Sequence, residues 1–313
     1  MSVAATYREH SYWRGYQKFF PVHLRCEGDR LPEESLWNWR EHQVHLDRFP
    51  SPSALLKLLV IHGAGGYGRM FAACGLAARE GGAEVVALDL PGYGLTTARR
   101  PYTHEDWVEC VADLVEAERR RDGRPVVLFG GSLGGMIAFA AACRGNVIGV
   151  IATCLLDPRV PAVRRAVSRF PWLASVGVRL LPWLAPILGA ARIPIRWLAK
   201  MDAMSGQEEL NELVRLDPIG GGNRVPLRFI ASYLTWRPPL EPEDFKICPV
   251  LLVHPERDQW TPVDLSRAFF DRLGCPKRLI ILGNASHFPV EEPGLTQLTE
   301  AITDFLAQRQ REL

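Results

Sequence analysis

The segment Val126–Ala142, VVLFGGSLGGMIAFAAA, places one serine in a turn bounded on both sides by paired glycines. Val126–Phe129 is apolar and rich in β-branched residues, which is typical of a buried strand. Met136–Ala142 is apolar and alanine-rich, which favours a buried helix. The glycines permit strained dihedral angles and close backbone packing. The sequence therefore predicts a strand, a very tight turn and a helix, with Ser132 as the side chain displayed at the turn.

The turn also matches a catalytic pattern. Gly130–Gly134 reads GGSLG and fits G-x-S-x-G, in which a serine between a strand and a helix serves as a nucleophile. A glycine-rich turn with an incidental serine is the alternative interpretation. A serine hydroxyl is a weak nucleophile unless a base takes its proton and an acid orients that base. The rest of the chain should therefore supply both groups.

Candidate partners follow two later strands. In a doubly wound sheet, reactive groups gather at the carboxyl ends of strands, and the pattern requires the chain order serine, acid, histidine. Asp258 follows the predicted strand Pro249–His254, and His287 follows the predicted strand Arg278–Leu282. We therefore predict Ser132, Asp258 and His287 as nucleophile, acid and base.

Other acids and histidines receive different interpretations. Asp157 ends the predicted strand region Val147–Leu156 on the same edge and is a rival acid. It could equally be a cap or boundary residue, and the flanks of Asp258 match the usual pattern better. Structural roles are expected for His62, His104 and His254. Asp89 is expected to shape its loop.

The oxyanion that develops when the serine adds to a carbonyl group needs fixed N–H donors. The backbone N–H of Leu133, directly after the nucleophile, is one candidate. The turn HGAGG at residues 62–66 should supply the other, with Ala64 as first choice and Gly65 as second. This turn lacks the spacing of a dinucleotide fingerprint and the Lys-Ser/Thr of a P-loop, so we expect no nucleotide there. No metal or organic cofactor is expected, since the motifs provide no ligand cluster.

The order of predicted elements indicates an α/β fold, a mostly parallel, doubly wound sheet covered by helices on both faces. Strands are expected at Trp39–Phe49, Leu55–Ile61, Glu84–Leu90, Val126–Phe129, Val147–Cys154, Pro249–His254 and Arg278–Leu282, and helices at Met70–Gly81, His104–Arg120, Met136–Cys143, Leu265–Leu273 and Leu295–Gln310. Thr103 is a plausible N-cap with a partial capping box. The alternation stops between residues 158 and 243. We therefore predict a core domain, 1–157 and 244–313, interrupted by a helical cap or lid, 158–243.

Composition limits the function classes. A net charge of +2 gives no argument for nucleic acid binding, and the seven cysteines lack C-x-x-C or zinc spacing. Met1–Arg14 is polar and carries both charge signs, so we expect no secretory leader. Reduced thiols and a cytoplasmic location follow as expectations. The sequence does not indicate an oligomeric state.

The apolar segment Pro171–Ala191 tests whether the chain enters a membrane. Its one charge is Arg179, whose burial at a bilayer centre would cost about 2.5–3.5 kcal/mol, and prolines 182 and 186 interrupt the segment. A buried or lid-like helix that can touch a lipid surface is therefore expected rather than a membrane span. Trp183 and Leu184 in this segment are expected to bind the apolar part of a substrate. The alternative is that they pack the insertion against the core.

Five motifs then resemble the landmarks of the α/β-hydrolase superfamily, in order, between about residue 55 and residue 313. They are HGAGG, LDLPGYG, GGSLGG, VHPERDQWTP and ASHFPVEEP. The resemblance implies the fold and the three catalytic roles assigned above. HGAGG and the helical insertion are also similar to monoacylglycerol lipases and lysophospholipases. The nucleophile motif departs from these by beginning Gly-Gly rather than Gly-His, and His287 follows Ala-Ser rather than Ala-Gly. The first 50 residues match no pattern.

The function predicted from the sequence is a serine hydrolase that cleaves apolar carboxylic esters of small molecules through an acyl-enzyme. Thioester hydrolysis, carbon–carbon bond hydrolysis and cofactor-free perhydrolysis are alternatives on the same three residues. A non-catalytic ligand-binding protein on this fold is a further alternative. Serine at the nucleophile position argues against haloalkane dehalogenases and soluble epoxide hydrolases, which use aspartate.

Overall fold

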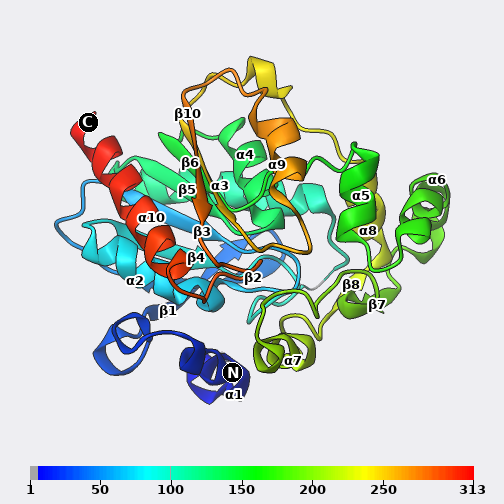
Figure 1. The fold of residues 1–313 in the computed structure, drawn as a ribbon, viewed down its shortest axis with the longest axis horizontal. Helices are drawn as coiled ribbons and strands as arrows, with labels where there is room; N and C mark the ends of the chain where they lie inside the picture. Colours follow the sequence, from blue (N-terminus) through cyan, green and yellow to red (C-terminus); the bar gives the residue numbers. More distant parts are fainter. Residues whose placement is uncertain (1–5, 99) are drawn as a thin grey trace.

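The computed structural model describes residues 6–98 and 100–313, apart from the side chains of residues 173–175. Eight strands of this described part form one sheet in the order β1-β2-β4-β3-β5-β6-β9-β10 (Figure 1). Their bounds are β1 Glu33–Trp39, β2 His42–Phe49, β3 Lys57–Ile61, β4 Glu84–Leu88, β5 Val126–Gly130, β6 Gly149–Ala152, β9 Val250–Pro255 and β10 Lys277–Leu282. From β4 to β10 each neighbouring pair is parallel, so the prediction of a mostly parallel sheet is confirmed.

The antiparallel edge of the sheet differs from the sequence prediction. One strand was expected at Trp39–Phe49, but the chain forms the hairpin β1–β2, and β2 then pairs antiparallel with β4. Arg40 sits in the turn with a left-handed φ of 51°. No glycine or proline marks this turn, and β1 is mostly exposed, so it carries no apolar pattern.

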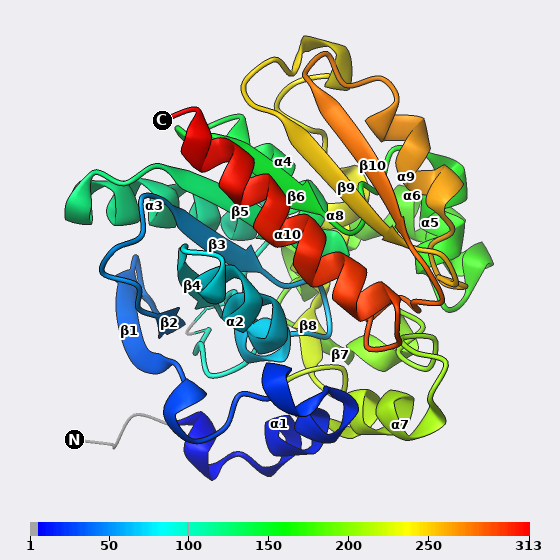
Figure 2. The same ribbon diagram turned by 60° about the vertical axis from the view of Figure 1, so that its left-hand side comes forward.

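Helices cover both faces of the sheet (Figure 2). Helices α2 (Ala72–Glu80) and α10 (Gly294–Arg311) pack together on one face. On the other face α3 (His104–Asp122) packs against α4 (Leu133–Ala142), and Phe139 of α4 contacts α9 (Val263–Phe270) through Phe269. The α3 N-terminus has a full capping box, because Thr103 and Asp106 each accept the other's backbone N–H. The sequence predicted only half of it.

Residues 158–243, called the insertion below, lie between β6 and β9 in the chain. They form α5 (Pro161–Val167), α6 (Pro171–Leu188), β7 (Arg192–Pro194), α7 (Glu208–Leu216), β8 (Arg224–Pro226) and α8 (Leu227–Thr235). Strands β7 and β8 pair antiparallel, and α6 packs along α8. The insertion gathers at one side of the sheet (Figure 1). Among the described residues, no helix is long and apolar enough to cross a membrane.

The N-terminal segment, whose residues match no sequence pattern, contains α1 (Ser11–Tyr16) and packs on the core through Tyr7, Trp13 and Tyr16. Buried Tyr7 donates to Asp89 at 2.7 Å, and buried Tyr16 donates to Asp217 of the insertion at 3.1 Å. Asp89 also accepts the backbone N–H of Leu95, in the loop that follows β4, and that of Gly68, in the segment that follows β3. Asp89 therefore shapes its loop, as expected, and also anchors the N-terminal segment.

Candidate active site

Ser132 occupies a strained turn between β5 and α4, with φ of 53° and ψ of −124°. A non-glycine residue rarely adopts a positive φ, and such strain gathers at functional sites. The flanking glycines are required by packing. A Cβ on Gly131 would lie 2.4 Å from the Phe71 ring, and one on Gly135 would lie 2.0 Å from the carbonyl oxygen of Cys154. The turn is thus packed tightly against Phe71 and against the segment that follows β6, and Ser132 lies at the carboxyl edge of the sheet.

Three side chains form a continuous hydrogen-bonded chain at this edge. Ser132 Oγ lies 2.8 Å from His287 Nε2, and His287 Nδ1 lies 2.7 Å from Asp258 Oδ2. Asp258 follows β9 and His287 follows β10, and both side chains are buried. The structure therefore brings together the three residues that the sequence placed at strand ends in the order serine, acid, histidine.

The loop after β9 holds Asp258 firmly. Its Oδ1 accepts the backbone N–H groups of Trp260 at 3.0 Å and Thr261 at 2.8 Å, and Thr261 Oγ1 donates to Oδ2 at 2.7 Å. Burial by itself would raise the pKa of Asp258. The electrostatic interaction and hydrogen bond with His287, and the hydrogen bonds from the backbone and side chain of Thr261, hold this pKa below its ordinary value. The carboxylate is thus ionised and oriented toward the imidazole. The sequence reasoning missed Thr261, although its place three residues after the acid was a usable signal.

Asp157, the rival acid, has a different partner. It accepts the backbone N–H of Arg159 at 2.8 Å and the Nε of the same residue at 2.9 Å. Arg159 also binds Glu241, so Asp157 belongs to an ion network at the start of the insertion. The structure places Asp258, and not Asp157, against His287.

The glycine turn after β3 lies against the start of α4. A Cβ on Gly63 would lie 3.0 Å from the backbone nitrogen of Leu133 and from Ser132 Cβ. Ala64 and Leu133 line the same cavity as Ser132. Gly65 has φ of 86° and faces Met201, whose sulfur would lie 2.6 Å from a Cβ there. Of the two candidate donors, Ala64 therefore lies at the cavity above Ser132, whereas Gly65 packs against Met201 of the insertion.

His62, His104 and His254 are all buried and make contacts within the core. His62 Nε2 accepts the N–H of Leu90 at 2.9 Å and its Nδ1 contacts the Gly63 carbonyl, while burial lowers its pKa to about 4. His254 Nδ1 lies 3.0 Å from the Thr153 carbonyl, and Thr153 Oγ1 in turn accepts the N–H of Ser132. His104 packs 4.9 Å from the Trp236 ring, and burial lowers its pKa to about 3. These three rings brace the core rather than face the serine hydroxyl.

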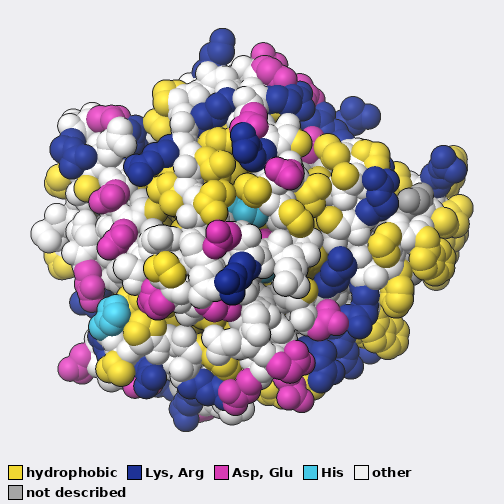
Figure 3. All heavy atoms as spheres, viewed as in Figure 1, with side chains coloured by type: hydrophobic (Ala, Val, Ile, Leu, Met, Phe, Trp, Pro, Cys, Tyr) yellow, Lys and Arg dark blue, Asp and Glu magenta, His cyan; other side chains and the backbone are white. Residues whose placement is uncertain are grey.

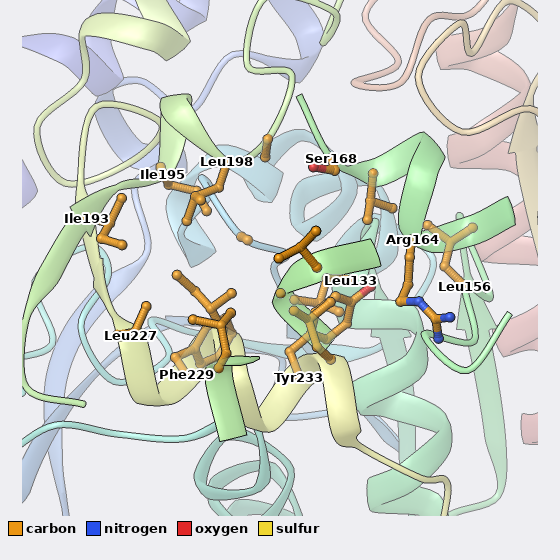
Figure 4. A pocket seen from close by; sticks show the side chains of 18 of the residues that line it. Leu133, Leu156, Arg164, Ser168, Ile193, Ile195, Leu198, Leu227, Phe229 and Tyr233 are labelled. Atoms are coloured by element: carbon orange, nitrogen blue, oxygen red, sulfur yellow. The ribbon is translucent and has the colours of Figure 1, made fainter. Parts of the chain in front are cut away.

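A cavity of about 420 Å³ opens above Ser132 and is lined mainly by apolar side chains of the insertion (Figure 4). The members from α6 and α8 include Val176, Leu180, Leu181, Leu184, Leu227, Phe229, Ile230 and Leu234. Leu184 lines this cavity as expected. Trp183 does not, because its side chain is 81% exposed on the outer side of α6. Arg164 also lines the cavity, and its Nη1 donates to the carbonyls of Pro158 and Arg159.

Two clusters of described residues have the composition of metal ligands, but both are occupied by internal contacts. One consists of Cys154 with Asp258 and His287, whose bonds are given above. The other joins Glu34, His45 and Asp47. Arg69 fills it by donating to both carboxylate oxygens of Asp47, at 2.5 and 2.6 Å. The seven cysteines are free thiols.

Comparison with known proteins decides the family. The family model described as "Alpha/beta hydrolase family" matches residues 58–296. The chain belongs to this family. Membership of the family assigns the protein to the hydrolases, and the motifs at HGAGG, GGSLGG and ASHFPVEEP lie in the matched region. A search of curated protein sequences found no match.

Solved structures of low sequence identity share the fold. A monoacylglycerol lipase from Paleococcus ferrophilus is 22% identical with a TM-score of 0.67, covering 85% of this chain and 99% of its own. A soluble variant of monoglyceride lipase from Saccharomyces cerevisiae is 18% identical with a TM-score of 0.72, covering 89% and 95%. Est1E from Butyrivibrio proteoclasticus, solved with ferulic acid bound, is 18% identical with a TM-score of 0.59, covering 88% and 99%. This chain and the three solved structures therefore share one architecture, although their sequences are only 18–22% identical to it.

Proposed function

We propose that this alpha/beta hydrolase is a serine ester hydrolase that cleaves small apolar carboxylic esters through an acyl-enzyme. The observation that carries the proposal is the hydrogen-bonded chain from Ser132 Oγ through His287 to Asp258. Such a chain lets the imidazole take the serine proton as the hydroxyl attacks an ester carbonyl. The ionised Asp258 stabilises the imidazolium that forms.

The proposed reaction then uses groups of this chain and water. The tetrahedral intermediate places its oxyanion beside the start of α4, where the N–H groups of Leu133 and Ala64 are the proposed donors. His287 returns its proton to the leaving alcohol, which leaves an ester on Ser132. His287 next activates a water molecule that releases the acid and restores the serine.

The substrate class is proposed from the cavity. The lining of the cavity is mainly aliphatic, and side chains such as Leu180, Leu184 and Leu234 form a wall that can bury an acyl chain. Burial of each methylene stabilises a bound chain by about 0.8 kcal/mol. The names of the two lipase neighbours agree with an acyl substrate, and we propose residues 158–243 as the cap that provides this wall.

Hydrolysis rates for a series of p-nitrophenyl esters test this proposal. The expected result is that kcat/KM rises roughly tenfold for each two added acyl carbons, until the chain fills the cavity. Activity confined to acetate would contradict the acyl-chain substrate and leave a small-ester hydrolase. A parallel series of thioesters separates the esterase from the thioesterase alternative. Binding of esters without turnover would instead indicate the ligand-binding alternative.

A further inference from the structure

Helix α6 carries an apolar face that no described part of the chain covers. Trp172, Trp183 and Ile187 are 65%, 81% and 82% exposed. Their spacing of eleven and four residues, together with Val176 between them, places them on one side of a helix. In Figure 3 this face forms the band of hydrophobic side chains at the outer edge of the insertion, where Figure 1 shows α6. An exposed apolar surface of this kind marks an interaction site.

The surroundings of this face are basic. Residues 158–201 contain eight arginines and lysines and no aspartate or glutamate, although the whole chain carries a net charge of only +2. Arg159 and Arg169 are neutralised by ion pairs with Asp157 and Asp202. Arg165, Arg179 and Arg192 are exposed. Lys and Arg side chains border the hydrophobic band in Figure 3. Residues 158–201 therefore carry only positive charge, and part of it, at Arg165, Arg179 and Arg192, is exposed near the apolar face.

We propose that this surface docks on an anionic lipid bilayer, with α6 lying in the plane of the interface. An exposed apolar helix face that carries tryptophan, with basic side chains nearby, is typical of surfaces that lie in a membrane interface. Here the charge comes from Arg179 of α6, Arg165 of α5 and Arg192 of β7. Negative lipid headgroups attract a cluster of basic side chains. Docking a second copy through the same face would bring two basic rims together, which disfavours self-association.

The docking surface continues into the cavity above Ser132. Leu180 and Leu184 are 52% and 41% exposed, and both also line the cavity. An apolar molecule in the outer lipid layer would therefore meet α6 and the cavity mouth together. This gives the acyl substrates a route that avoids water, although docking itself does not depend on the proposed reaction.

Vesicle flotation with the Ser132→Ala protein tests the inference without consuming lipid. Vesicles of phosphatidylcholine alone are compared with vesicles of equal parts phosphatidylcholine and phosphatidylglycerol. The bound fraction is expected to correspond to about tenfold or greater affinity for the anionic vesicles, and to fall as salt screens the charges. Adding Trp183→Ser and Ile187→Ser should remove binding to both kinds of vesicle. Leu55→Ser, a matched exposed leucine outside the insertion, should leave it unchanged.

Charge variants complete the design. Arg165→Gln with Arg179→Gln should weaken binding to anionic vesicles only, whereas Arg311→Gln at the C-terminal helix should have no effect. Three results would overturn the inference. One is no flotation with anionic vesicles, and another is equal flotation of the Trp183→Ser, Ile187→Ser protein. The third is a lipid-free dimer, seen by sedimentation, that these two serines dissociate, because the face would then serve self-association.

Discussion

The two walls of the active-site cavity are built by different forces. The wall beneath Ser132 comes from strand ends, glycines without room for a Cβ, and buried hydrogen bonds to Asp258 and His287. The opposite wall, from α6 and α8, consists of aliphatic side chains, several of them partly exposed. Directional contacts fix single residues, whereas apolar packing tolerates exchange of similar side chains. Substitutions should therefore abolish turnover on the first wall and change substrate preference on the second.

The largest effect is expected at the nucleophile. Ser132→Ala should lower kcat by about 10⁶-fold, as in other serine triads, because no other group can form the acyl-enzyme. The folded protein should persist, since alanine fits the space of serine. Ester hydrolysis and thermal unfolding of the purified variant measure both. Retention of near-normal turnover would remove Ser132 from the mechanism.

The acid should have the next largest effect. Asp258→Asn should lower kcat by about 10⁴-fold, because an amide does not hold the imidazole in the required tautomer. Asp157→Asn is the matched control on the same edge of the sheet and should cost much less, since it breaks an ion pair with Arg159 instead. If the ranking of the two variants were reversed, the acid would belong after β6.

Substitutions on α6 test whether the wall opposite Ser132 sets the substrate preference. Leu184→Ala should reduce the preference for octanoate over acetate about tenfold, since it removes apolar contacts with the end of the chain. Trp183→Ala, the adjacent outward-facing residue, should leave the ratio of the two kcat/KM values unchanged in detergent-free solution. A loss of preference in both variants would mean that α6 turns during catalysis. A fall in thermal stability alone would mean that Leu184 only packs the insertion.

The smallest effect concerns the buried polar network that anchors the N-terminal segment. Burial alone would lower the pKa of His45, but hydrogen bonds with Asp89 and Glu34 raise it to about 10. A raised histidine pKa stabilises the fold fully below the unfolded value of about 6.5, and this contribution fades as pH rises toward 10. The melting temperature of the wild type should therefore fall between pH 6.5 and 8 more steeply than that of His45→Gln. Parallel curves would show that His45 is uncharged in the folded protein.

The sequence predicted the residues of the wall beneath Ser132 much better than those of the wall from α6 and α8. Gly130–Gly135, Asp258 and His287 stand in places where backbone geometry or strand order leaves few alternatives, so their positions follow from local sequence. Trp183 and Leu184 are adjacent and both apolar, and only the rotation of α6 decides which one faces the cavity. That rotation depends on packing against α8, which a single sequence does not display.

The sequence did not indicate the hairpin β1–β2, for a related reason. Arg40 adopts a left-handed turn without the glycine or asparagine that normally signals one. The N-terminal segment shows the same limit, since Tyr7 and Tyr16 are held by Asp89 and Asp217, which lie 82 and 201 residues away. Long-range polar pairs of this kind leave no periodic pattern in the chain.

Fluorophosphonate labelling tests the central claim most directly, because the reagent reacts with a serine that a neighbouring base has activated. The wild-type protein should acquire one adduct, located at Ser132 by peptide mass spectrometry. The rate of labelling should fall by orders of magnitude in His287→Gln and remain near the wild-type rate in Asp157→Asn. An unlabelled Ser132, or a labelling rate that is the same with and without His287, would contradict the assignment of Ser132 as an activated nucleophile.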